Sequence, residues 1–366
     1  MITARAPGKL FVAGEYAVVE PGGDAVVVAV DRHVRVQLGP ARDRGTVDSD
    51  QPGWLPLTWS RDATGVVADD GRGLDHVLSA IRTVEEFVAG LGIDPRNHAL
   101  RISSDLDDAD GRKYGLGSSG AVTVATIRAL DEFYGLHLTP LEQFRLALLA
   151  IIEVAPTSSG GDVAASSFGG WISYRSPDRA ALAELRARDG VLAAFRAPWP
   201  SLSVTPLPSP DALEFVVGWT GAAASTARLV DDVHAAAGAG RAAGTALPYE
   251  DFLTASRARV ADLTAGLADG DPERVLAAVR AARRLLVGLG TGLGVEIETP
   301  ALTRLCDEAE AIGAAAKSSG AGGGDCGIVL ARRGTDLTPM LKGWELAGVR
   351  RLTLAVAPPE PLVGAR

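Results

Sequence analysis

Three of the four lysines in this chain stand beside glycine-rich segments. The 36 basic residues are mostly arginine, so each lysine that is kept suggests a need for a compact ammonium group. An ammonium beside backbone amides that glycine leaves accessible is the arrangement that a polyphosphate requires. We therefore expect three anion-binding segments, which are Ala6-Pro7-Gly8-Lys9, Lys113 with residues 115–120, and Lys317 with residues 320–324.

The clearest of these segments is the second, which reads Gly115-Leu116-Gly117-Ser118-Ser119-Gly120. A Gly-x-Gly turn lets backbone amides approach an anion without a Cβ in the way. The two serines would cap the following helix, and a serine hydroxyl at such a site can also bind the magnesium ion that accompanies a nucleotide. The segment matches neither the GxxxxGK[ST] loop nor the GxGxxG dinucleotide pattern, so it indicates another class of phosphate-binding turn.

Two carboxylates accompany these segments. Asp162 lies between a glycine pair and an alanine run, and Glu153 stands nine residues earlier, at the end of an apolar helix. One of these acids could bind magnesium while the other orients a nucleophile or a lysine. The alternative for Asp162 is structural, because an aspartate in this place could simply cap the helix after it.

The composition excludes several classes of function. A net charge of −9 and a pI near 5.2 argue against a general nucleic-acid binder. Cys306 and Cys326 have no zinc-motif spacing, and the five histidines stand apart from the glycine segments, so we expect neither a metal cluster nor a histidine-based catalyst. No apolar run reaches transmembrane length, and the N-terminus resembles a strand rather than a signal peptide. We expect a cytoplasmic protein without a membrane partner, and the sequence gives no indication of its oligomeric state.

Hydrophobic periodicity predicts an α+β protein, and 366 residues exceed one ordinary core, which favours two domains. A hairpin is expected over residues 2–38, with its turn at Pro21-Gly22-Gly23. The proline-rich stretch 198–210 separates the predicted domains 1–197 and 211–366, and residues 235–246 are typical of a connector. Further strands are expected at 98–103, 213–219, 325–331 and 351–357, and helices at 74–91, 118–134, 141–154, 178–189, 225–236, 249–267, 271–286, 300–312 and 337–346.

The three glycine segments together resemble those of the GHMP kinase superfamily, which includes galactokinase, homoserine kinase, mevalonate kinase and phosphomevalonate kinase. They occur in the family's order between residues 6 and 327, so the resemblance covers nearly the whole chain. It implies an N-terminal nucleotide-binding α+β domain and a C-terminal ferredoxin-like α+β domain, with the active site in the cleft between them. It also implies ATP and Mg²⁺ as cofactors and a small-molecule substrate.

Within the superfamily, the chain is most similar to the bacterial phosphomevalonate kinases. The similarity rests on Tyr16 after Gly-Glu, on Lys113, on Asp325-Cys326-Gly327, and on residues 218–221 leading into 224–226. It implies phosphoryl transfer from ATP to (R)-5-phosphomevalonate, giving (R)-5-diphosphomevalonate on the mevalonate route to isoprenoids. The alternatives are mevalonate kinase, another GHMP small-molecule kinase, a related decarboxylase, and a sensor that binds ligands without catalysis. The chain departs from the family pattern at residues 155–158.

The resemblance also implies a role for each residue of the motifs. Lys9 and Asp162 would meet at the transferred phosphoryl group, and Ser119 and Glu153 would lie near magnesium. Lys113 would act in catalysis and would contact the substrate phosphate. The remaining substrate contacts would be Tyr16, Ser225, Thr226, Gly320, Ala321 and Gly322, and the ATP phosphates would lie on Gly115, Leu116, Gly117, Ser118, Ser119 and Gly120.

Overall fold

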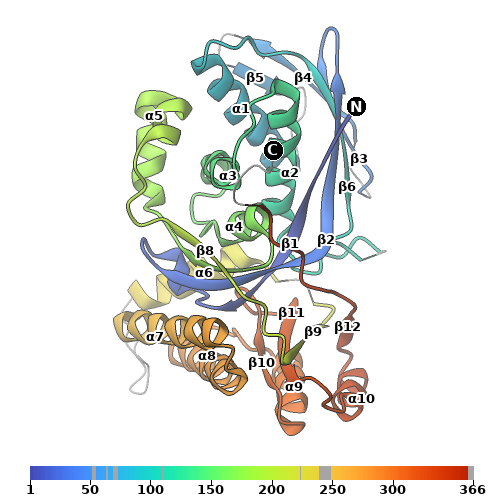
Figure 1. Cartoon of the computed structure of the whole chain (residues 1–366), viewed down its shortest axis with the longest axis vertical. Helices are drawn as coiled ribbons and strands as arrows, with labels where there is room; N and C mark the ends of the chain where they lie inside the picture. Colours follow the sequence, from blue (N-terminus) through green and yellow to red (C-terminus); the bar gives the residue numbers. More distant parts are fainter. Residues whose placement is uncertain are drawn as a thin grey trace.

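The computed structural model describes residues 1–51, 55–62, 65–68, 73–108, 110–222, 224–238 and 249–361. These residues form two sheets, a large one in the upper half of the molecule and a four-stranded one in the lower half (Figure 1). Among the described residues, no helix is both long enough and apolar enough to cross a membrane.

The larger sheet has the strand order β5-β4-β3-β6-β2-β7-β8, with β1 paired to β2. The expected N-terminal hairpin is confirmed, because β1 and β2 pair antiparallel through a connection that contains the short helix η1 (Ala17–Val19). The other pairs are antiparallel, except for β3 with β6. The strands are β1 (Ile2–Ala13), β2 (Asp24–Pro40), β3 (Gly45–Ser49), β4 (Leu57–Asp62), β5 (Gly65–Ala68), β6 (His98–Ser104), β7 (Trp171–Arg175) and β8 (Ser203–Leu207).

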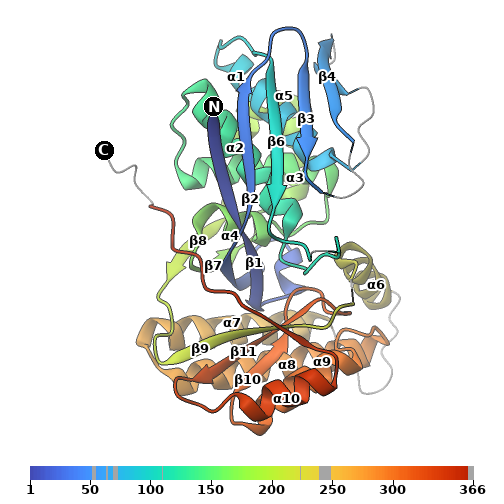
Figure 2. The same ribbon diagram turned by 90° about the vertical axis from the view of Figure 1, so that its right-hand side faces the viewer.

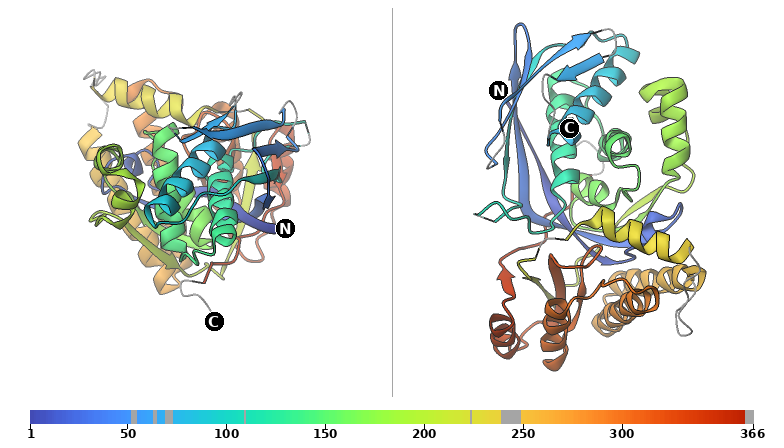
Figure 3. Two further views of the ribbon diagram at one scale, coloured as in Figure 1. Left: turned by 90° about the horizontal axis from the view of Figure 1, so that it is seen from above. Right: turned by 180° about the vertical axis from the view of Figure 1, so that it is seen from behind.

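Helices cover one face of the larger sheet and leave the other face open (Figures 2 and 3). They are α1 (Asp75–Gly90), α2 (Ser118–Tyr134), α3 (Pro140–Val154), α4 (Gly161–Phe168) and α5 (Arg179–Arg196). The helices bury apolar side chains of the strands, and Phe144, Trp171 and Tyr174 are among the largest residues in this core. Helix α3 begins at a capping box, in which Thr139 and Glu142 satisfy each other's backbone amides.

The smaller sheet has the order β10-β11-β9-β12, and all its pairs are antiparallel. Helices α9 and α10 pack on it through a separate apolar cluster that contains Leu305, Met340 and Trp344. Helices α7 and α8 lie side by side, and α7 also contacts the ends of β1 and β2 (Figure 1). The elements are β9 (Leu213–Trp219), β10 (Ala315–Ser318), β11 (Cys326–Arg332), β12 (Arg350–Leu352), α6 (Thr226–Gly238), α7 (Tyr249–Asp269), α8 (Pro272–Leu293), α9 (Pro300–Ala311) and α10 (Thr338–Leu346).

The strand expected over 351–357 is only partly correct. The chain leaves the smaller sheet after β12 and crosses back to the larger one, where Val356 forms a bridge with Val30. The backbone of Ala357 bonds to Ala29 and to Gly170 there, and the amide of Glu360 bonds to Phe168.

Other departures concern short strands and helix ends. The strands β3, β4, β5, β7, β8 and β10 were not expected, and α8 runs seven residues beyond its predicted end at 286. The predicted end at 189 coincides with a kink at Gly190, whose φ of 83° and ψ of 173° are not helical, and helical turns resume after it as far as Arg196. Strand β8 lies inside the predicted interdomain stretch and pairs with β7 of the larger sheet, while the domain limits themselves stay a prediction. Of the expected connector 235–246, residues up to Gly238 belong to α6, and the rest lies outside the described residues.

Candidate active site

The second glycine segment forms a turn that leads directly into α2. Gly115 and Gly117 both have positive φ, 80° and 78°, which a side chain would strain. Gly117 is the N-cap of α2, with no side-chain cap, so the expectation that the serines would cap this helix is wrong. Ser118 and Ser119 instead occupy its first turn, where their hydroxyls are available to a ligand.

Lys9 and Asp162 pack against two glycines at the start of α2. A Cβ at Gly117 would lie 2.8 Å from Cε of Lys9, and a Cβ at Gly120 would lie 2.8 Å from Oδ2 of Asp162. The Lys9 Nζ donates a hydrogen bond to the carbonyl of Gly115, 3.3 Å away. The glycines therefore allow an ammonium and a carboxylate to reach the same helix terminus, where the dipole favours anions.

Asp162 does not cap α4, which excludes the alternative that this aspartate serves only as a helix cap. The N-cap of α4 is Gly160, and Asp162 lies within the first helical turn. Its Oδ1 accepts a bond from the adjacent amide of Val163, 2.9 Å away, while Oδ2 faces Gly120. The side chain thus points toward α2 rather than toward its own helix end.

A cavity of about 430 Å³ opens at this helix terminus. Its walls come from β1, α2 and α4 on the side of the larger sheet, and from α6 and the loop between β10 and β11 on the side of the smaller sheet. The cavity therefore lies between the two halves of the molecule. The expected site residues that line it are Lys9, Tyr16, Lys113, Gly115, Gly117, Ser118, Ser119, Asp162, Thr226, Gly320 and Ala321.

Two acids that the sequence analysis did not assign also line this cavity. Glu15 is 4 % exposed and forms an ion pair with Lys317, which is fully buried, so the third lysine serves this pair rather than the cavity surface. Asp325 packs its side chain against Gly115, and its Oδ1 accepts a bond from the amide of Ala224 at 3.3 Å. Burial raises the pKa of Asp325 above its ordinary value.

Comparison with known proteins decides the family. The family model of the GHMP kinases N terminal domain matches residues 75–170, and that of the GHMP kinases C terminal matches residues 263–343. The phosphomevalonate kinase of Streptomyces sp. (strain CL190) is 47 % identical over 97 % of both chains. This chain is a GHMP kinase.

Two further relatives of this GHMP kinase are similar to it along most of the chain. The mevalonate kinase of Thermococcus sibiricus is 30 % identical over 90 % of the chain and 89 % of the relative. The structure of Streptococcus pneumoniae phosphomevalonate kinase in complex with phosphomevalonate and AMPPNP superposes with a TM-score of 0.83 at 28 % identity, covering 97 % of this chain and all of that one. The two-domain GHMP kinase fold is therefore confirmed.

The structure does not bring Glu153 to the cavity of this GHMP kinase. Its Oε1 accepts a bond from Arg82 at 3.0 Å, and its Oε2 accepts bonds from Arg186 at 2.6 Å and from the hydroxyl of Ser79 at 2.9 Å. Both oxygens are thus engaged, and Glu153 does not line the cavity. These contacts join α1, α3 and α5, and the expected place of Glu153 near magnesium stays a prediction.

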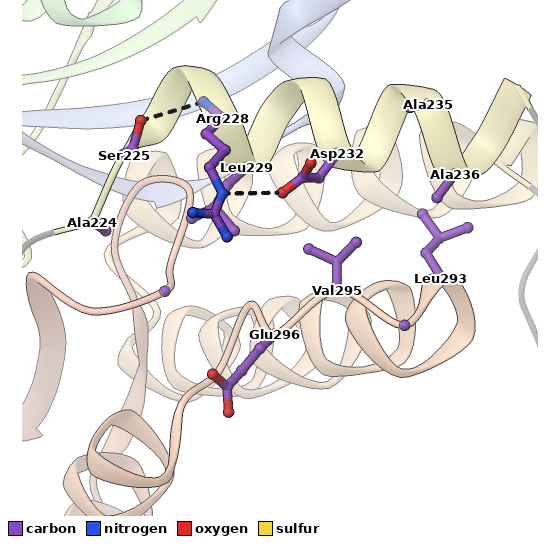
Figure 4. Close-up of a pocket in the computed structure, with 12 residues that line it drawn as sticks. Ala224, Ser225, Arg228, Leu229, Asp232, Ala235, Ala236, Leu293, Val295 and Glu296 are labelled. Carbon is purple, nitrogen blue, oxygen red and sulfur yellow. Dashed lines mark hydrogen bonds and ion pairs between the residues drawn. The ribbon is translucent and has the colours of Figure 1, made fainter.

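Ser225 and Gly322 also lie outside the cavity. Ser225 precedes α6, where its hydroxyl accepts a bond from the amide of Arg228 at 3.4 Å, and it lines a different cavity of about 640 Å³ between α6 and the end of α8 (Figure 4). A Cβ at Gly322 would lie 2.1 Å from the carbonyl oxygen of Ile297, so this glycine permits a close backbone approach. The substrate contacts expected of these two residues stay predictions, whereas Thr226 does line the cavity.

Leu116 and Gly120 belong to the turn but do not line the cavity. Leu116 is buried, and its carbonyl accepts a bond from the amide of Lys9 at 2.8 Å. Gly120 is covered by the side chain of Asp162. Their expected contact with ATP phosphates stays a prediction for the backbone of the turn.

His76 is a site residue that sequence reasoning missed. It lies in the first turn of α1 and lines both the main cavity and a neighbouring one of about 200 Å³. Its Nδ1 is buried without a hydrogen-bond partner, and burial lowers its pKa below the ordinary value. The expectation that the histidines avoid the glycine segments is therefore wrong for His76. No sequence signal could have found it, because the contact is formed only by folding.

The neighbouring cavity extends the main one along α2. The two cavities adjoin, because His76, Lys113, Ser118 and Ser119 line both. Apolar side chains of α1 and β6 form much of its wall, with polar groups at the edge. Its lining includes Leu74, Val77, Ile102, Ser49, Gln51 and Asp107.

Proposed function

We propose that this GHMP kinase transfers the γ-phosphoryl group of ATP to (R)-5-phosphomevalonate and forms ADP and (R)-5-diphosphomevalonate. The observation that carries this assignment is the 47 % identity with a phosphomevalonate kinase along 97 % of both chains. The mevalonate kinases compared here are 27–32 % identical, so the chain is clearly nearer to the enzyme that acts on the phosphorylated substrate.

The charges of the cavity support an acceptor that carries its own phosphate. Lys9 and Lys113 line the same cavity, and so do Ser118 and Ser119 at the N-terminus of α2. A nucleotide and a phosphorylated acceptor together bring more negative charge than ATP alone, and two ammonium groups with a helix terminus offset that charge. Thr226 would add a hydroxyl donor on the opposite wall.

The nucleotide would occupy both cavities. We place its base in the smaller cavity against Leu74, Val77 and Ile102, because apolar side chains flanked by polar groups suit a purine. The phosphates would then pass Ser118 and Ser119 and enter the main cavity over the glycine turn. The acceptor would approach from the side of Thr226 and Ala321.

The residues present fit a magnesium ion that is held mainly by the nucleotide. Among the described residues, no group of three or more His, Cys, Asp or Glu side chains could hold a metal by itself. Magnesium commonly keeps several waters and takes only one or two protein ligands beside phosphate oxygens. The hydroxyls of Ser118 and Ser119 and the carboxylate of Asp162 would serve as these ligands or hold its waters. When bound, magnesium neutralises charge on the β- and γ-phosphates.

In the transfer step, an oxygen of the acceptor phosphate forms a bond to the γ-phosphorus while the bond to the β–γ bridging oxygen breaks and ADP leaves. Lys9 would stabilise negative charge on the phosphoryl group during its transfer, since its ammonium is held at the turn by the carbonyl of Gly115. Lys113 would hold the acceptor phosphate. Asp162 would orient Lys9 or the metal, because a phosphate acceptor is already ionised at neutral pH and needs little help from a base.

The test is ADP release with 5-phosphomevalonate, mevalonate, homoserine and galactose as separate acceptors, each with saturating ATP and magnesium. We expect the highest kcat/KM with 5-phosphomevalonate. A higher value with mevalonate would assign the chain to the mevalonate kinases instead. The absence of ADP release with every acceptor, in a protein that still binds ATP, would favour a sensor that binds ligands without catalysis.

A further inference from the structure

Lys113 is presented by a loop that belongs to the larger sheet but reaches toward the smaller one (Figure 2). The loop folds back on itself after β6, since Asp107 and Lys113 form a β-bridge and the amide of Asp108 bonds to the carbonyl of Arg112 at 2.7 Å. Within the described part of the chain, no hydrogen bond or ion pair holds the Lys113 ammonium. Its position is therefore determined by the position of the loop.

Arg350, on β12 of the smaller sheet, binds this loop through polar contacts. Its NH2 group lies 2.8 Å from Oδ1 of Asp108 and donates a hydrogen bond to the hydroxyl of Tyr114 at 3.2 Å. The Tyr114 hydroxyl in turn donates to the same Oδ1 of Asp108 at 2.9 Å. The three side chains form a closed triangle in which each polar group has a partner.

Cation–π and aromatic contacts add to these hydrogen bonds. The guanidinium of Arg350 lies over the ring of Trp219 on β9, 4.7 Å from its centroid, and Trp219 meets the ring of Tyr114 edge-on at 5.2 Å. The carbonyl of Tyr114 also accepts a bond from the thiol of Cys326 at 3.0 Å. Tyr114 stands between Lys113 and Gly115, so every contact that fixes it also fixes the acceptor-side lysine and the first glycine of the turn.

We propose that Arg350 is a positioning residue that sets the affinity for the acceptor by holding the loop that carries Lys113. The inference rests on the proposed function, because it takes Lys113 as the group that binds the acceptor phosphate. Arg350 lines neither cavity of the site, so it acts through Tyr114 and Asp108. The contact also joins β12 to the larger half of the molecule and makes the acceptor site depend on how the two halves are placed.

A role in stability alone does not account for the arrangement. The Arg350 side chain is 49 % exposed, and exposed ion pairs contribute little to the free energy of unfolding. Its polar partners, Asp108 and the Tyr114 hydroxyl, belong to the loop that carries Lys113, while the rings of Tyr114 and Trp219 beneath it are themselves buried in the apolar core. Removing Arg350 should therefore change the kinetics of the acceptor more than the stability of the fold.

The experiment compares Arg350→Met with Arg351→Met. Arg351 is the next residue on the same strand and pairs with Glu214 at 3.4 Å on the surface, so the control removes the same charge from the opposite side of β12. We expect Arg350→Met to raise the KM for 5-phosphomevalonate about tenfold, while the KM for ATP and the melting temperature change little. Arg351→Met should leave all three quantities unchanged.

Tyr114→Phe provides a second and independent measurement. It keeps the ring that stacks on Trp219 but removes the hydroxyl that links Arg350 to Asp108. We expect it to raise the acceptor KM as well, and the double variant should be no worse than Arg350→Met alone, because both changes break one triangle. Arg350→Lys should restore only part of the affinity, since lysine cannot reproduce the planar stacking.

Three results would overturn the inference. They are an unchanged acceptor KM in folded Arg350→Met and Tyr114→Phe, an equal rise in the KM for ATP, or the same rise in Arg351→Met. Failure of the proposed function is a separate outcome, because the wild-type chain would then show no kinase activity with 5-phosphomevalonate before any variant is compared.

Discussion

The hydroxyl of Tyr16 donates a hydrogen bond to the carbonyl oxygen of Ala321, 2.5 Å away and 305 residues further along the chain. Tyr16 is 3 % exposed and has a positive φ of 62°, which is uncommon for a residue with a side chain. Burial raises the pKa of its hydroxyl well above the ordinary value, so the donor stays protonated. The bond ties the turn after β1 to the third glycine segment, and both partners line the main cavity.

Tyr16→Phe should lower both stability and activity. The buried carbonyl of Ala321 would lose its donor, which costs about 1 kcal/mol in the free energy of unfolding. The cavity wall would also be less well fixed, so kcat/KM for the acceptor should fall. Urea denaturation and steady-state kinetics measure the two effects. Unchanged kinetics in a destabilised variant would show that the bond serves the fold alone.

The buried pair of Lys317 and Glu15 should respond differently to single and double substitution. Lys317 is fully buried and also bonds to the carbonyl of Ser318 at 2.5 Å, so Lys317→Met leaves an unpaired buried carboxylate. Removing one partner of such a pair typically costs about 3–5 kcal/mol. Adding Glu15→Leu should recover part of that loss in denaturant unfolding. The exposed Lys342→Met is the control, and an equal loss there would contradict this account.

Gly120→Ala should separate catalysis from stability. Its Cβ would displace the carboxylate of Asp162, which lies 2.8 Å from that position, and a shift of this size typically lowers kcat by about tenfold or more. Because alanine favours a helix more than glycine does, the loss of stability should be small. Gly288→Ala, at an open position in α8, is the matched control and should leave kcat unchanged. An unchanged kcat in Gly120→Ala would remove Asp162 from the site.

Lys9→Met should reduce turnover far more than ATP affinity. The Lys9 ammonium is fixed at the turn, and losing one preorganised charge of this kind lowers kcat by about 10²–10³-fold. The measurement is kcat for ADP release together with ATP binding by calorimetry. Near-normal turnover in a folded variant would contradict the role proposed for Lys9.

Asp162→Asn should keep the acid limb of the pH–rate profile while lowering the rate. The second pKa of a phosphate monoester is about 6, so the acceptor protonates and loses reactivity as the pH falls through that value. The fall in rate at low pH then reflects protonation of the substrate phosphate, so both proteins should regain activity above that pKa. Profiles with saturating ATP and magnesium test this. Disappearance of the limb in the variant would assign it to Asp162 acting as a base.

Local patterns predicted most helices of the fold but few of its short strands. The helical repeat from Leu74 and the glycine turn directly before α2 are local signals, so α1 and α2 begin within one residue of the prediction. Strands such as β10 and β5 span only four residues, too few for an alternation to stand out. Each is an edge strand held by the neighbouring strand along the chain, β5 by β4 and β10 by β11, so pairing places it rather than a pattern within its own four residues.

The sequence predicted the site residues whose surroundings are set by the local backbone turn. It did not predict contacts that depend on side chains from distant elements. Gly117 and Asp162 follow from motifs because the turn itself fixes their surroundings. Glu153 was placed near magnesium by the resemblance to the GHMP kinases, and no local pattern shows that Arg82 and Arg186 engage it from other helices. Ser225 precedes α6 and Thr226 begins it, yet only Thr226 lines the main cavity.

The return of residues 355–360 to the larger sheet has a consequence for synthesis of the chain. Strands β1 and β2 are made first, yet one backbone group each of Ala29, Asp31 and Gly170 bonds to this late segment. A nascent chain can form β1 and β2 early, but these last bonds of the larger half form only after the smaller sheet has been made. A chain that stops after β12 would therefore contain every strand of both sheets and still lack these bonds.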